Sequence, residues 1–80
     1  MDEVLLNRLA ERIRSLRKQY KLTQEELAEK SGVSYKHLQK LEGKYYHDPQ
    51  LGTLIKIANV FNISVSELLD FPTTTKKENK

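Results

Sequence analysis

The feature that constrains this chain most is a pair of short helical segments with almost no sequence between them. Residues 27–42 read LAEKSGVSYKHLQKLE, and only Gly32, Val33 and Ser34 separate the two segments. Gly32 can adopt the left-handed conformation that ends a helix, and the Ser34 hydroxyl can cap the next helix. Two helices joined by so short a turn cross at roughly 90–120°. We therefore expect the second helix, residues 35–42, to project from the domain.

The apolar pattern predicts another helix before this pair, and a capping box predicts where the first helix of the pair begins. Over residues 3–20, apolar side chains recur at helical spacing. They form one stripe: Leu6, Leu9, Ala10, Ile13, Leu16 and Tyr20. In the sequence TQEE, the Thr23 hydroxyl can accept a hydrogen bond from the Glu26 amide, and the Glu26 carboxylate can accept one from the Thr23 amide. A second helix is expected to start there.

Two more helices are expected after Gly43, which stops the projecting helix. Asp48 and Pro49 are a plausible cap and first-turn pair for a fourth helix. Its expected inward stripe is Leu51, Leu54, Ile55, Ala58 and Phe61. Ser64 and Glu67 repeat the capping-box pattern and begin a short fifth helix. That helix is expected to bury Val65, Leu68 and Leu69. Because no segment shows the alternation of a strand, the predicted fold class is all-α with five helices.

Length and composition allow one domain and exclude several classes of protein. Eighty residues can form one modest core, which we assign to residues 1–71, and the polar sequence of residues 72–80 is expected to be a disordered tail. The absence of cysteine excludes disulfides and thiolate zinc sites. No apolar run approaches the roughly 18 residues of a membrane span, and the N-terminus lacks the basic start of a signal peptide. We expect a cytoplasmic protein with no membrane partner.

Positive charge is concentrated in one part of the chain. Residues 12–46 contain nine lysines and arginines against four acidic residues, whereas residues 47–71 contain one lysine against three acidic residues. This asymmetry suits a polyanion bound on one side of the domain. The alternative is that the cations simply solvate helix surfaces, and the charge counts alone do not separate the two interpretations.

The residues around this two-helix unit resemble a known family. The segments ERIRSLRKQYKLTQEELAEKSGVS, LEGK and DPQLGTLIKIANVFNISVSELL are similar to the Cro/phage-repressor type of helix-turn-helix regulators, the xenobiotic-response-element family. The resemblance covers roughly residues 9–69. It implies a five-helix, phage-repressor-like domain of prokaryotic or phage origin. It also implies binding to a double-stranded DNA operator, usually as a homodimer, with helix 35–42 in the major groove.

The resemblance, together with the chemistry of the side chains, assigns candidate DNA contacts. The residues expected to contact bases are Gln24, Tyr35, Lys36, Gln39 and Lys40. Lysine suits this role because it can donate to O6 and N7 of guanine. The residues expected to contact phosphates are Arg14, Lys18, Thr23, Ser34, Lys44, Tyr45 and Tyr46. The amide groups at the starts of helices are further phosphate sites.

Other polar residues have structural interpretations. The resemblance pairs Arg17 with Glu42, and a bidentate ion pair is the economical arrangement because burying either charge alone is costly. Ser34 is first a helix cap, and its phosphate contact is left open. His37 either packs against the domain or contacts DNA. His47 is interpreted as loop polarity, because no second histidine or cysteine completes a metal site.

Two other functions are alternatives to DNA binding. The same fold can serve an antitoxin or another partner-binding module, because fold does not fix function. Apolar side chains on the outer face of helix 35–42 would favour that alternative, whereas its lysines and glutamine favour DNA. An enzyme is disfavoured, because the sequence contains no nucleophile–base–acid set, glycine-rich phosphate loop or metal-ligand spacing. We expect no cofactor, no metal and no small-molecule ligand.

Overall fold

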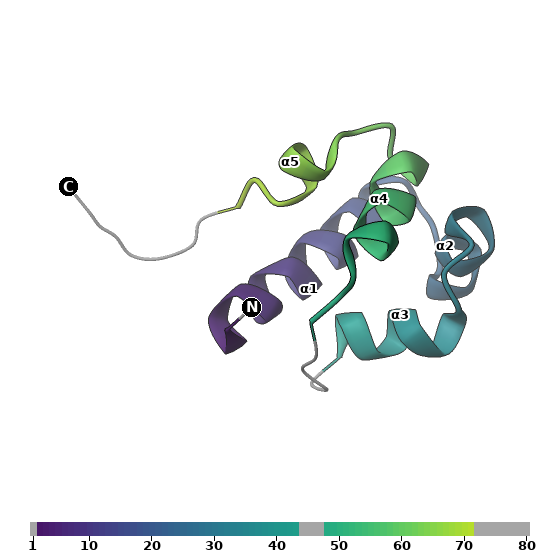
Figure 1. Cartoon of the computed structure of the whole chain (residues 1–80). Coiled ribbons are helices and arrows are strands. Elements are labelled where there is room, and N and C mark those ends of the chain that lie inside the picture. The colour runs from purple at the N-terminus through teal and green to yellow at the C-terminus, as the bar shows by residue number, and fades with distance from the viewer. Residues whose placement is uncertain (1, 44–47, 72–80) are drawn as a thin grey trace.

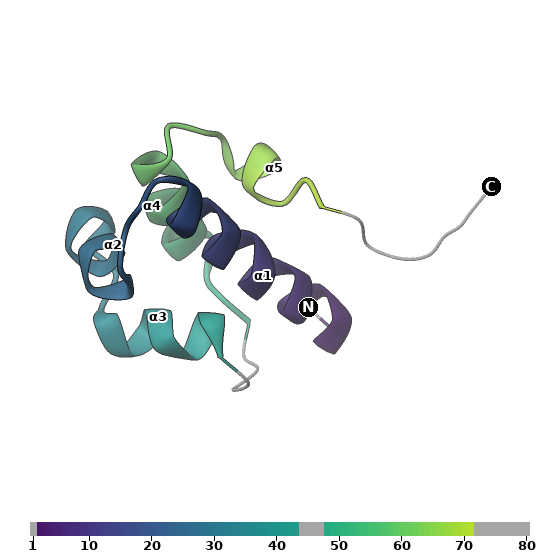
Figure 2. The same cartoon turned by 180° about the vertical axis from the view of Figure 1, so that it is seen from behind.

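The described part of the chain, residues 2–43 and 48–71, forms five helices and no strand, as the sequence predicts (Figure 1). In this computed structural model the helices are α1 (Glu3–Gln19), α2 (Gln24–Ser31), α3 (Tyr35–Glu42), α4 (Leu51–Val60) and α5 (Val65–Leu68). Helices α3 and α5 lie on opposite sides of α1 and α4, an arrangement that both views of the domain agree on (Figures 1 and 2).

Helix α1 is the longest element and carries the predicted apolar stripe. Asp2 caps its start by accepting a hydrogen bond from the Leu5 amide at 2.9 Å. The buried part of the stripe is Leu9, Ala10, Ile13 and Leu16. At its far end Tyr20 is 47% exposed, but its ring packs 5.0 Å from that of Phe61 and its hydroxyl donates to the Phe61 carbonyl. Tyr20 therefore lies at the margin of the core.

The two-helix unit, from the start of α2 to the start of α3, has the predicted local structure. Thr23 and Glu26 form both hydrogen bonds of the capping box, at 3.1 and 2.9 Å. Gly32 ends α2 with φ +81°, in the left-handed region that favours glycine. The Ser34 hydroxyl then accepts from the His37 amide at 3.1 Å, which caps α3. Each of these interactions is local in sequence, so its pattern could be recognised without knowledge of the fold.

The predicted start and inward face of α4 are partly wrong. The helix begins at Leu51 with Gln50 as its N-cap, so Asp48 and Pro49 do not form the cap pair. Leu51 and Ile55 are exposed, at 64% and 43%. The buried face is instead Leu54, Ile57, Ala58 and Phe61, with spacing i, i+3, i+4 and i+7. The apolar residues of α4 are compatible with more than one inward face, and packing against the other helices determines which face is buried.

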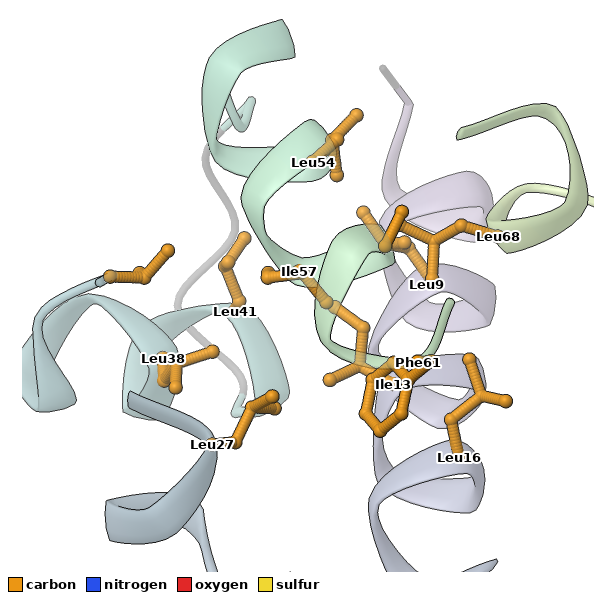
Figure 3. Packing of buried hydrophobic residues seen from close by; sticks show 12 residues of the cluster. Leu9, Ile13, Leu16, Leu27, Leu38, Leu41, Leu54, Ile57, Phe61 and Leu68 are labelled. Carbon is orange, nitrogen blue, oxygen red and sulfur yellow. The ribbon is translucent and has the colours of Figure 1, made fainter. Parts of the chain in front are cut away.

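All five helices contribute side chains to one core (Figure 3). The largest fully buried side chains are Phe61, Leu9, Ile13, Leu27, Leu38, Ile57 and Leu68. Full burial of such a side chain contributes about 1.5–3 kcal/mol relative to exposure. In α5 only Leu68 is buried, whereas Val65 and Leu69 are half-buried against the core rather than inside it. The core thus holds α3 by its buried face and leaves the opposite face exposed to solvent.

Candidate nucleic-acid interface

Helix α3 has a buried face and an exposed polar face. Its buried side chains are Leu38, Leu41 and Glu42. The predicted base-contacting residues of the helix are exposed on the other side: Tyr35, Lys36, Gln39 and Lys40. Together they present two ammonium groups, a carboxamide and a phenol hydroxyl, which include both donors and acceptors. No apolar aliphatic side chain interrupts this face, so it suits a polar, anionic surface.

The polar residues at the edge of this face are placed differently. Ser34 is exposed and its hydroxyl serves as the α3 cap, so the structural half of its interpretation holds. His37 is half-buried, which fits the packing alternative. Gln24, the first residue of α2, is half-buried rather than fully exposed.

A cavity of about 510 Å³ lies where the end of α1, the start of α2 and the start of α3 meet. It is lined by Arg17, Lys18, Lys21, Leu22, Thr23, Gln24, Glu25 and Tyr35. Its charged lining residues are Lys18, Lys21, Glu25 and Arg17, of which Arg17 is paired with Glu42. The first amides of α2 add a positive dipole end. The structure thus brings together four predicted contact residues that are spread over 18 positions of the sequence.

Lys21 belongs to this cavity and was missed by sequence reasoning. It adopts φ +57°, the left-handed conformation, directly after α1 ends. The signal in the sequence was its position two residues before Thr23, between a helix end and a helix start. A lysine in a connecting turn resembles any solvated surface lysine, so its sequence gives no reason to single it out. It lies three positions after Lys18, and its amide donates to the Lys18 carbonyl at 3.0 Å.

Arg17 and Glu42 lie together and connect α1 to α3. Arg17 Nη2 lies 2.9 Å from Glu42 Oε1, and Arg17 Nε lies 3.1 Å from Oε2. Arg17 Nη1 also donates to the Leu22 carbonyl at 3.0 Å. The Glu42 side chain is 1% exposed and the Arg17 side chain 15%. Such fork geometry gives the stronger kind of charged hydrogen bond.

Arg14 also contacts Glu42, through the main chain rather than the carboxylate. Its half-buried guanidinium donates from Nη1 to the Glu42 carbonyl oxygen at the end of α3. The next residue, Gly43, is tightly placed, because a Cβ there would lie 2.8 Å from the Gln39 carbonyl oxygen. From the sequence, Arg14 was expected to contact phosphate. Its contact with Glu42 could not be predicted, because the acceptor is a backbone carbonyl 28 positions away.

Several predicted features fall outside the described residues. Lys44, Tyr45, Tyr46 and His47 lie there, as does the tail of residues 72–80. Within residues 2–43 and 48–71, no group of three or more metal-ligating side chains is gathered. None of the helices in the same part of the chain has the length and apolar character to cross a membrane.

Glu26, at the start of α2, has a perturbed acidity. The hydrogen bond from the Thr23 backbone amide, helped by the Thr23 hydroxyl and by the charge of Lys30, holds the pKa of the Glu26 carboxyl below its ordinary value of 4.5. The Glu26 carboxylate therefore stays ionised to a lower pH than an ordinary glutamate.

The sequence of this chain is similar to those of known helix-turn-helix proteins. Residues 13–68 match the family model described as Helix-turn-helix, HTH_3. The immunity repressor protein of Bacillus phage phi105 is 39% identical over 70 residues, which are 88% of this chain and 48% of the repressor. An uncharacterized HTH-type transcriptional regulator of Archaeoglobus fulgidus is 48% identical over 61 residues, which are 75% of this chain and 84% of that protein. This chain thus spans about half the length of the phage repressor.

A solved structure is similar in fold as well as in sequence. The master regulator for biofilm formation SinR, crystallised in complex with DNA, is 35% identical to this chain with a TM-score of 0.72. The match covers 78% of this chain and 98% of the SinR chain in that crystal.

Proposed function

We propose, because this chain belongs to the helix-turn-helix family, that it is a sequence-specific DNA-binding transcriptional regulator that inserts α3 into the major groove of an operator. The observation that carries the proposal is the exposed polar face of α3, set against a face buried in the core. SinR, which was crystallised with DNA, and the phage immunity repressor support the same function by similarity. Such a regulator acts where prokaryotic or phage DNA is, in the cytoplasm.

Base recognition is proposed for the outer face of α3 and for Gln24. Lys36 and Lys40 each supply an ammonium group for guanine O6 and N7. Gln39 can donate and accept at adenine N6 and N7, and Tyr35 adds a hydroxyl at the start of the helix. A good contact of this bidentate kind discriminates between bases by about 1–3 kcal/mol.

Phosphate binding is proposed for the cavity at the α1–α2 junction. Lys18 and Lys21 provide charge there, and the amide end of α2 provides donors, with Thr23 beside them. Ser34 is the N-cap of α3, as Thr23 is of α2, and is proposed to contact phosphate in the same way. Lys44, Tyr45 and Tyr46 remain predicted phosphate contacts on the sequence alone. Because each neutralised phosphate releases counterions, affinity is expected to fall steeply as salt is raised.

Binding is proposed to involve two copies of the chain. A single small domain covers little DNA, and a two-fold dimer reads two half-sites about 34–36 Å apart. The apolar candidates for this contact lie between α4 and α5 and just after α5: Phe61, Ile63 and Phe71. Phe61 is 1% exposed and so cannot meet a partner, whereas Ile63 and Phe71 are only partly buried. The proposed contact is therefore limited to the latter two and their surroundings.

Selection of bound duplexes from a random pool at fixed salt tests the proposal. Enrichment of a palindromic motif supports sequence-specific binding by a dimer. Lys36→Ala combined with Lys40→Ala is then expected to change the preference at defined base positions, whereas Lys44→Ala weakens all sequences alike. If no motif is enriched, the proposal fails and the partner-binding module, such as an antitoxin, becomes the better interpretation.

A further inference from the structure

Two arginines of α1 hold the last residue of α3 by different groups. Arg17 binds the Glu42 carboxylate, and Arg14 donates to the Glu42 backbone carbonyl. The two arginines are three positions apart, so they lie on neighbouring turns of one face of α1. Helix α3 is thus fixed to α1 at its C-terminal end, opposite the end that carries Tyr35 and Lys36.

The two contacts restrain different degrees of freedom. A glutamate side chain has three rotatable bonds, so an ion pair to its carboxylate still allows the helix backbone to shift. The Arg14 contact reaches the backbone itself and supplies a donor to one of the last carbonyls of α3, which lack partners within the helix. A cation at this end also matches the helix dipole. Arg14 therefore fixes the helix end more directly than Arg17 does.

We propose that Arg14 is a positioning residue for DNA recognition: it fixes the C-terminal end of α3, and through it the angle of the base-contacting face, without binding a phosphate. This inference rests on the proposed function and replaces the phosphate contact expected for Arg14 from the sequence. The guanidinium is half-buried and already donates within the domain. Lys18, by contrast, is exposed, lines the α1–α2 cavity and is available to phosphate.

The two roles predict different changes in binding. Loss of a phosphate contact weakens every duplex alike and lowers the slope of log affinity against log salt by about 0.9. Loss of α3 positioning instead displaces the base contacts, so affinity for the selected sequence falls while non-specific affinity and the salt slope are retained. One misplaced base contact is expected to reduce the ratio of specific to non-specific affinity at least about fivefold.

The experiment compares Arg14→Met with two reference variants of the same helix. Arg12→Met is the matched structural control, because Arg12 also donates to a backbone carbonyl, that of Glu67 in α5, far from α3. Lys18→Met is the reference for a lost phosphate contact. Dissociation constants are measured over a salt series for the selected duplex and for an unrelated duplex of equal length, at a temperature where circular dichroism reports each variant folded. Arg14→Met alone is expected to lower the affinity ratio, with a wild-type slope.

Other outcomes overturn the inference. A slope reduced as in Lys18→Met, with an unchanged ratio, assigns Arg14 to phosphate. An unchanged ratio and slope, with only a lowered melting temperature, makes it a purely structural residue. If Arg14→Met does not fold, Arg14→Lys is used: a lysine serves a phosphate contact at near wild-type affinity, but its single, shorter-reaching ammonium is expected to reduce the ratio. Failure of the wild-type protein to select any duplex refutes the proposed function instead, and is seen before any variant is made.

Discussion

Helix α1 is connected by arginine side chains to α3 on one side of the domain and to α5 on the other, and the two connections differ. On the α3 side, Arg14 and Arg17 satisfy both the carbonyl and the carboxylate of Glu42. On the α5 side, Arg12 Nη2 donates to the Glu67 carbonyl at 2.9 Å, while its buried Nε has no hydrogen-bond partner in the described part of the chain. The Glu42 groups on the α3 side thus have arginine partners, whereas on the α5 side one buried donor of Arg12 has none.

The difference follows from what each helix contributes. Helix α3 carries the proposed base-contacting face, so its orientation has to be set, and directional charged hydrogen bonds set orientation. Helix α5 is a single turn that covers the core with Leu68. Covering apolar surface needs area rather than a fixed angle, because the hydrophobic effect is non-directional. Arginines of α1 thus orient α3 through Arg14 and Arg17, whereas Arg12 makes only one hydrogen bond to α5.

Removal of Glu42 is expected to have the largest effect and tests the α3 connection directly. Glu42→Ala leaves the Arg17 guanidinium, which is only 15% exposed, without its carboxylate. Breaking a buried ion pair by removing one partner costs about 3–5 kcal/mol, and the lower end applies here because Arg17 retains some contact with water. Urea unfolding measures the loss, with the exposed Glu29→Ala as control. Equal loss in both variants would mean that the pair does not hold α3.

The second largest effect is expected on the α5 side, from the loss of an apolar side chain. Leu68→Ala removes the only buried side chain of α5 and is expected to destabilise the domain by about 2–3 kcal/mol, the lower end of the usual range for Leu→Ala, because a single-turn helix can settle into the space that is left. Hydrogen exchange of the α5 amides, compared with those of α1, shows whether the helix separates from the remaining domain. A loss no larger than that of Val65→Ala, where the side chain is only half-buried, would contradict the assignment of α5 to the cooperative core.

Arg12 is expected to contribute little, which is the sharpest contrast with the α3 connection. Arg12→Met removes one hydrogen bond, which typically contributes about 0.5–1.5 kcal/mol. It also removes a buried, unpartnered Nε, and a buried donor without a partner costs about 1–3 kcal/mol. These two terms oppose each other, and their midpoints of about 1 and about 2 kcal/mol leave a small difference, so the variant is expected to unfold with a free energy equal to that of the wild type or about 1 kcal/mol higher. A loss as large as that of Glu42→Ala would remove the difference between the two connections.

The comparison also separates what the sequence predicts from what it does not. Both capping boxes and the Gly32 turn were predictable, because each depends on residues within four positions of one another. The start of α4 was not, because Asp48–Pro49 is a sound local signal for a cap, yet the helix begins after Gln50, whose side chain makes no capping hydrogen bond. The Arg14 contact was not predictable either, since its acceptor is a backbone carbonyl, which every residue has. Local signals specify elements, and only packing specifies contacts between them.

The smallest expected effect concerns Glu26 and acid stability at the start of α2. Its folded pKa lies below the ordinary value of 4.5, chiefly through the hydrogen bond from the Thr23 amide. A lowered folded pKa gives a stabilisation that is complete above the unfolded pKa and is lost as pH falls through the folded one. Glutamine also fits a capping box but does not titrate, so Glu26→Gln keeps the cap. The quantity to measure is the melting temperature of the wild type minus that of Glu26→Gln. It is expected to be constant near neutral pH and to decrease once the pH is lowered past about 4.5. An increase of this difference in acid would contradict the lowered pKa.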